Sequence, residues 1–99
     1  MPAYFLLDIR EITDAVKMEE YKARVTPVVE KFGGRYPVID GPFEVVEGSS
    51  APVFPVMIQF PHMEQARHWY HSDEYRELKV LRLAAIVSNA TLMAGLETV

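Results

Sequence analysis

The stretch AYFLLDIREI, residues 3–12, decides the fold of this chain. It is rich in residues that favour strands, and it ends just before Thr13 and Asp14, which can cap a helix. Successive side chains of a strand point to opposite faces of its sheet. The apolar side chains of this stretch therefore lie on both faces: Tyr4 and Leu6 on one, and Phe5, Leu7 and Ile9 on the other.

A helix is predicted from Asp14 to Phe32. Its apolar residues recur at steps of three and four positions, which is typical of a helix with one buried face. They are Met18, Tyr21, Val25, Val28 and Phe32. Pro27 removes a backbone hydrogen bond inside this segment, which predicts a kink or a helical restart near Thr26. Gly33 supplies the left-handed conformation that ends a helix.

Four further strands and two shorter helices are predicted after this helix. RYPVI at 35–39 and FEVVEG at 43–48 are expected to form a hairpin. VFPVMIQF at 53–60 is the next strand, and its internal proline indicates an irregular or edge start. NATLMAGL at 89–96 is expected to close the fold as the last strand.

The stretch RHWYHSDEY, residues 67–75, combines histidines, acids and aromatic residues. It is either a catalytic or metal-binding cluster or the junction of two helices. We favour the junction, because Met63 to His71 reads as a short helix and Ser72, followed by two acids, can start another that reaches about Ile86.

The order of elements predicts an α+β fold of the ferredoxin-like βαββαβ type, an antiparallel sheet with two helical segments on one face. Such a sheet is expected to be polar on its uncovered face. The strands at 3–12 and 53–60 carry apolar side chains on both faces, so we expect a partner. The simplest partner is a second copy that packs sheet on sheet as a symmetric homodimer. The alternative is that the chain uses these side chains internally.

The composition limits the class of protein. A chain of 99 residues fits a single domain over residues 1–99. We expect a cytoplasmic protein without a membrane partner, since no apolar run approaches the roughly 20 residues of a membrane span and the start does not resemble a signal peptide. There is no cysteine. A net charge of −4 without a basic stripe argues against a nucleic-acid partner.

Several short motifs together resemble the domain-of-unknown-function 1330 family. They are PAY at 2–4, EEY at 19–21, KFGGRY at 31–36, EG at 47–48, FP at 60–61, ARHWYHSDEY at 66–75 and LR at 81–82. The likeness covers Pro2 to about Gly95. The chain departs from the family at Asp73, where a proline is common, and at Pro55, which lies within a strand.

The resemblance implies a ferredoxin-like fold that dimerises as an α/β barrel. It also implies a superfamily that includes cofactor-free monooxygenases, haem-degrading enzymes and lactone isomerases. It implies no established reaction and supplies no settled catalytic residues. The candidate site therefore depends on the chemistry of the residues themselves.

Arg82 is the first candidate site residue. Tyr75 and Leu78 precede it by seven and four positions, so all three share a helix face that carries the guanidinium toward the sheet. A buried guanidinium needs a carboxylate, a set of carbonyl groups or an anionic ligand. Asp8 is our first choice of carboxylate, and Tyr36 is expected to add a hydroxyl to the same region. Arg82 is thus either half of a structural salt bridge or the anchor of a ligand carboxylate or enolate.

Other candidate chemistry is weaker. His68 and His71 can share a helix face, but zinc needs three or four ligands and no His-Glu-x-x-His motif or cysteine completes the set, so we expect no metal. Pro2 would become an N-terminal amine if Met1 were removed, as a tautomerase base requires, although proline is common at this position. Trp69 is expected in the core or in the wall of a pocket.

Two classes of function remain open. One is a cofactor-independent enzyme, monooxygenase- or isomerase-like, that acts on a small anionic or aromatic metabolite in a pocket between the helices and the sheet. The other is a binding or stress-related accessory dimer that holds a ligand without turnover. The candidate catalytic residues are Arg82, Asp8 and His71, and the candidate ligand-binding residues are Tyr36, Trp69, Tyr75 and Arg82. No cofactor is expected.

Overall fold

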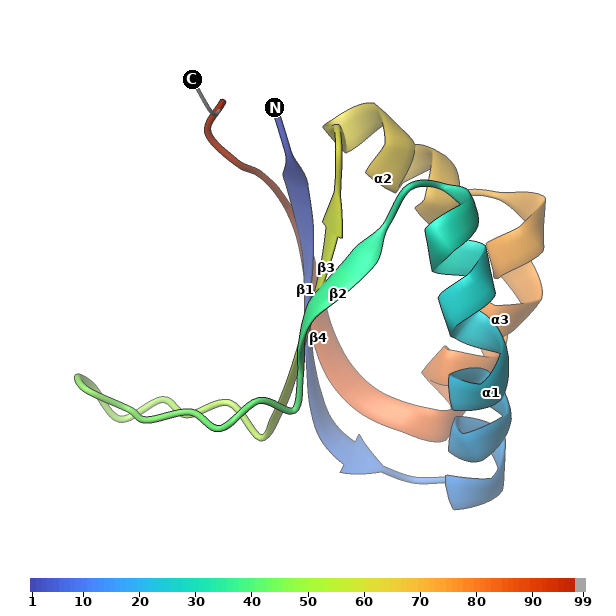
Figure 1. Ribbon diagram of the computed structural model, residues 1–99. Coiled ribbons are helices and arrows are strands. Elements are labelled where there is room, and N and C mark those ends of the chain that lie inside the picture. The colour runs from blue at the N-terminus through green and yellow to red at the C-terminus, as the bar shows by residue number, and fades with distance from the viewer. Residues whose placement is uncertain (98–99) are drawn as a thin grey trace.

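Strand β1 (Ala3–Ile12) lies inside a four-stranded antiparallel sheet of order β2-β3-β1-β4. The computed structural model describes residues 1–97, and three helices cover one face of this sheet (Figure 1). The remaining elements are α1 (Ala15–Lys31), β2 (Arg35–Ile39), β3 (Phe54–Phe60), α2 (Met63–Tyr70), α3 (Asp73–Ala85) and β4 (Ile86–Ala94). The ferredoxin-like α+β arrangement expected from the sequence is confirmed.

The two faces of β1 have different environments. Its inner row is buried beneath the helices and consists of Ala3, Phe5, Leu7 and Ile9. Tyr4 and Leu6 point to the other face, where no helix lies, and they are only half-buried. We call this helix-free side of the sheet the outer face. Leu6 is paired with Met57 of β3, so the outer face continues as an apolar surface on the neighbouring strand.

Helix α1 begins and ends as the sequence predicts. The Asp14 side chain accepts a hydrogen bond from the backbone N–H of Lys17 at 3.1 Å, which caps the first turn. At the other end Gly33 has a φ of 83°, and Gly33 and Gly34 donate to the carbonyls of Glu30 and Val29. This pair of bonds is the Schellman motif that typically closes a helix.

A kink or a helical restart was expected near Thr26, and the restart does not occur. Helix α1 runs through Pro27 without interruption. Pro27 and Ala23 are both exposed, so water can bond the Ala23 carbonyl that the proline leaves without its usual donor.

The hairpin predicted between residues 35–39 and 43–48 is wrong. Strand β2 instead pairs with β3, as in the register of Val38 with Met57. Residues 40–53 form a long connection without strands, which we call the arm, and it extends from the outer face of the sheet (Figure 1). A strand preference is realised only where pairing and burial support it, and residues 43–48 leave the sheet although the outer edge of β2 is unpaired.

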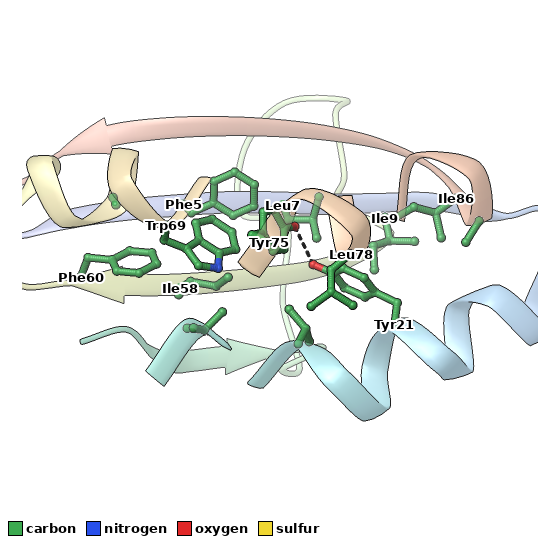
Figure 2. Close-up of a cluster of buried hydrophobic side chains, with 14 of the residues drawn as sticks. Phe5, Leu7, Ile9, Tyr21, Ile58, Phe60, Trp69, Tyr75, Leu78 and Ile86 are labelled. Carbon is green, nitrogen blue, oxygen red and sulfur yellow. Dashed lines mark hydrogen bonds between the residues drawn. The ribbon is translucent and has the colours of Figure 1, made fainter. Parts of the chain in front are cut away.

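Trp69 of α2 lies at the centre of the core (Figure 2). Its ring centroid is 4.3 Å from that of Tyr75, 5.1 Å from that of Phe5 and 5.3 Å from that of Phe60. The Trp69 side chain therefore joins both short helices to the two central strands.

The stretch at residues 67–75 is a helix junction, as predicted. The Ser72 hydroxyl donates to the Trp69 carbonyl at 2.8 Å and accepts from the Tyr75 backbone N–H at 3.1 Å, so one side chain ends α2 and starts α3. Strand β4 begins directly at Ile86, three residues earlier than expected, because Ile86 and Val87 already pair with the end of β1. No helix in residues 1–97 combines the length and apolar character needed to cross a membrane.

We predict that Gly34→Ala lowers the free energy of unfolding by about 1 to 3 kcal/mol, because the added methyl group overpacks the core. It would lie 2.5 Å from Val29 Cγ1 and 2.8 Å from Phe60 Cε1. Urea unfolding measures the change. Gly41→Ala is the control, since its methyl group meets Val38 at an ordinary 3.5 Å. Equal stability of the two variants would contradict the packing argument.

Candidate functional site

A cavity of about 400 Å³ lies between the inner face of the sheet and α1. Most of its wall is apolar and comes from β1, β3 and α1, including Leu7, Ile9, Met18, Val25, Val56 and Ile58. Its mouth is formed by Ile12, Ile39 and Val53, three apolar residues that are each about half exposed. A largely apolar cavity with a few polar groups is the usual form of a small-molecule site.

The polar groups of the cavity wall are few. Tyr21, Tyr36 and Thr26 are its hydroxyl-bearing residues, and Glu11 is an exposed acidic residue at its border. Arg10 and Lys22 also border the cavity, and each is paired with an acid that does not line it, Arg10 with Asp8 and Lys22 with Glu19. Tyr36 therefore lies in the expected pocket, whereas Tyr21 and Glu11 were not among the predicted site residues.

Arg82 is buried, with 1 % of its surface exposed, as its helix face predicts. Its Nε donates to the Tyr75 hydroxyl at 3.2 Å, and its Nη1 donates to the Ser88 hydroxyl at 3.3 Å. Both partners are neutral, and none of the ion pairs among residues 1–97 involves Arg82. The structure therefore contains a buried cation that is held by hydroxyl groups.

The expected pair between Arg82 and Asp8 is wrong. Asp8 follows Tyr4 and Leu6 on the outer face, while α3 lies against the inner face. Its carboxylate instead binds Arg10 at 2.6 Å and accepts from the backbone N–H groups of Val53 and Phe54. The alternation along β1 correctly predicts that Asp8 shares a face with Tyr4 and Leu6. It does not indicate which face of the sheet packs against the helices.

A chain of hydrogen bonds connects Arg82 to the cavity. The hydroxyl groups of Tyr75 and Tyr21 are 2.8 Å apart (Figure 2), and Tyr21 lines the cavity. Because the Tyr75 oxygen accepts from Arg82, its own proton is best used as a donor to Tyr21. The Tyr21 proton is then available to an acceptor in the cavity. We call Arg82, Tyr75 and Tyr21 the hydroxyl chain.

The phenols of this site are held in their neutral form. Burial raises the pKa of Tyr21 well above its ordinary value, and the neighbouring Tyr75 raises it further. Burial likewise raises the pKa of Tyr36 and of Tyr75. Burial lowers the pKa of Arg82, but Tyr75, Tyr21 and Tyr70 together outweigh this, and the net pKa is raised. At neutral pH the site therefore combines a fixed positive charge with neutral hydroxyl donors.

Two buried polar atoms near this region have no hydrogen-bond partner. They are the Trp69 indole nitrogen and the Gln65 side-chain oxygen, four residues apart on α2. Figure 2 shows the indole nitrogen directed toward Ile58, a residue of the cavity wall. An unpaired buried N–H is costly, and a ligand acceptor or a water molecule would remove that cost.

The other predicted residues lie apart from the cavity. Trp69 and Tyr75 are in the core, and Tyr75 reaches the cavity only through Tyr21. His71 is exposed at the end of α2, with its ring against Tyr70. No group of three or more histidine, cysteine or acidic side chains within residues 1–97 is arranged to hold a metal ion.

Some of the cavity residues that were not predicted have recognisable features in the sequence. Tyr21 lies on the apolar face of α1, and a buried tyrosine hydroxyl usually needs a partner. Its partner Tyr75 is 54 residues away, which no local pattern indicates. A bulge between Ile9 and Glu11 shifts the register and places Glu11 opposite Val87 of the outer face, so simple alternation could not locate it.

The fold resembles several solved structures. A protein of unknown function from Rhodopseudomonas palustris superposes with a TM-score of 0.74 at 23% identity, covering 98% of this chain and 84% of that one. A variant of SnoaB, a cofactor-independent oxygenase from Streptomyces nogalater, gives a TM-score of 0.63 at 12% identity, covering 98% and 95%. A Caulobacter crescentus protein for which antibiotic biosynthesis monooxygenase activity has been suggested gives 0.59 at 11% identity, covering 97% and 91%.

These likenesses establish the fold and not the reaction, because all three identities are low. No curated protein matches the sequence. The model of one family, described as a domain of unknown function (DUF1330), matches residues 2–96, which is nearly the whole chain. The chain therefore belongs to the DUF1330 family.

Proposed function

We propose that this protein binds a small apolar or aromatic metabolite that carries an acidic oxygen, such as a phenol or an enol, and converts it without a cofactor. One observation supports this proposal above the others. Tyr21 both lines the apolar cavity and ends the hydroxyl chain that begins at the buried Arg82. A ligand oxygen at Tyr21 would meet a donor polarised by a positive charge.

Such a site favours the anionic form of its ligand. A hydrogen bond to a charged acceptor is stronger than one to a neutral acceptor, and the apolar wall strengthens it further. Arg82 and Tyr75 would act as positioning residues, and Tyr21 as the group that contacts the ligand. This division follows from the cavity wall, which includes Tyr21 but neither of the others.

Enolates and phenolates suit two reactions that need no cofactor. In an oxygenation, a CH₂ group and O₂ become a carbonyl group and water. In an isomerisation, the proton removed from one carbon returns to another. Both begin with loss of a proton, and Glu11, the exposed acidic residue that borders the cavity, is the candidate to accept it in place of Asp8 and His71. The fold likeness to SnoaB supports the oxygenation.

We also propose that the protein is a homodimer joined through the outer faces of two sheets. Tyr4, Leu6 and Met57 form an apolar surface there, and no helix covers it. Val87 and Met93 of β4 extend this surface and are about half exposed. Extended apolar surfaces on a protein usually mark an interface.

We predict that Tyr21→Phe weakens binding of 2-naphthol about tenfold, because the cavity loses its donor to the ligand oxygen. Naphthalene, which has the same rings and no oxygen, should bind the two proteins equally. Fluorescence titration measures both affinities. Tyr70→Phe is the control, since Tyr70 lies outside the cavity wall.

Turnover assays with hydroxyaromatic compounds, combined with the same titration, separate the two classes of function. Oxygen uptake or product formation that is lost in Glu11→Gln would support catalysis. Binding without turnover across such compounds would favour the accessory binding protein. An unchanged 2-naphthol affinity in Tyr21→Phe would overturn the proposed site altogether.

We predict that Arg82→Met raises the free energy of unfolding by about 1 kcal/mol, because a buried charge with neutral partners is replaced by an apolar side chain of similar length. The same variant should bind 2-naphthol more weakly. Arg76→Met is the control, since Arg76 is an exposed residue of the same helix. A marked loss of stability in Arg82→Met alone would show that Arg82 has a structural role.

We predict that Met57→Lys gives a folded monomer, because the charge lies on the outer face. Leu7→Lys should instead prevent folding, because Leu7 belongs to the buried inner row. Sedimentation and circular dichroism measure assembly and folding. Val80→Lys, an exposed change on α3, is the control that should remain dimeric if the wild type is. A dimeric Met57→Lys would contradict the proposed interface.

A further inference from the structure

The arm, residues 40–53, has a fixed base. The Asp8 carboxylate accepts from the backbone N–H groups of Val53 at 2.9 Å and Phe54 at 3.1 Å, and Arg10 donates to the Ala51 carbonyl at 3.0 Å. At its other end, the Asp40 N–H donates to the Pro55 carbonyl at 2.8 Å. These bonds set the direction in which the arm leaves the sheet.

That direction carries the arm away from its own subunit. Figure 1 shows it extending from the outer face, opposite the helices and the cavity. The radius of gyration is 13.9 Å, larger than the roughly 12.6 Å expected for a compact chain of this length. Beyond its base at Val53, the arm therefore does not cover the mouth of its own cavity.

The side chains of the arm suit a contact with another molecule. Phe43 and Val45 are about half exposed, and Val46 is 83 % exposed. The charged residues of the arm are Asp40, Glu44 and Glu47, and the arm contains no lysine or arginine. The arm thus offers an apolar surface with a net negative charge.

The mouth of the cavity has a matching apolar surface. Its exposed apolar residues are Ile12, Ile39 and Val53. The mouth lies at the same end of the sheet as the base of the arm, because Ile39 directly precedes the arm and Val53 is its last residue.

A homodimer joined through the outer faces can bring the two features together. If its two-fold axis runs along the strands, the arm bases of both subunits lie at one end, and each arm points toward the partner's mouth. With the axis perpendicular to the strands, each arm would meet the end that carries the Met1 amine, His62 and Glu97. The apolar side chains of the arm fit the first arrangement better, because the exposed apolar residues of the mouth lie at that end.

We propose that the arm of a second copy of this chain covers the mouth of the cavity, so that each site is completed by the partner subunit. The inference rests on the dimer of the proposed function and goes beyond it, because it assigns Phe43, Val45 and Val46 of the partner subunit to the site. The arm then controls the entry and release of ligand.

Disulfide trapping tests this arrangement cleanly, because the chain has no cysteine. Val46→Cys protein is mixed with Ile12→Cys protein that carries a tag, so that a mixed disulfide is recognised by its size. We expect the mixed dimer to form readily under mild oxidation. The control replaces Ile12→Cys with Val80→Cys, at a residue of α3 that is 63 % exposed, and it should form no more than background.

A second readout tests whether the arm acts as a cover. In the trapped dimer, release of 2-naphthol should slow at least several-fold, and a reductant should restore it. Equal trapping at Ile12 and Val80, or unchanged release, overturns the inference. If sedimentation still gives a dimer and Tyr21→Phe still weakens binding, the proposed function survives that failure. A monomeric wild type overturns the inference together with the dimer.

Discussion

The stacking of Trp69 on Tyr75 is the contact on which the rest of this structure depends. The two rings join α2 to α3 across the Ser72 junction, and Trp69 also packs on Phe5 and Phe60 of the sheet. A tyrosine ring fixed in this way has its hydroxyl in one place. That hydroxyl lies between Arg82 and Tyr21, so the packing of the core sets the geometry of the hydroxyl chain.

Burying a cation without an acidic partner costs desolvation free energy, which is a large cost for a chain of 99 residues. The neutral phenols around Arg82 offset that cost only in part, since a hydroxyl group offers a dipole and not a charge. Binding of an anionic ligand would offset the remaining desolvation cost of Arg82, so this arrangement favours an anion in the site. The cavity beside Tyr21 is where such a charge can arrive.

Much of the fold could be predicted from periodicity alone. The alternation in β1, the three- and four-residue spacing in α1 and the Ser72 cap each depend on neighbours close in sequence, and each was found correctly. The hairpin at 43–48 did not form although β2 is an edge strand with one unpaired edge, because residues 40–53 leave the sheet instead of turning back along it. The burial of Arg82 could also be predicted, but its hydrogen-bond partners could not. They depend on which face of the sheet packs against the helices and on Tyr21, which is distant in sequence.

The pairing of β1 with β4 also has a consequence for how the chain folds during synthesis. Ala3 lies opposite Ala94, so β1, which is synthesised before the other strands of this sheet, is bonded along one edge by the last of them. Contacts so far apart in sequence close large loops and slow folding. Until β4 emerges, the nascent chain exposes one edge of β1 and part of its apolar inner row, which is the kind of surface that chaperones recognise.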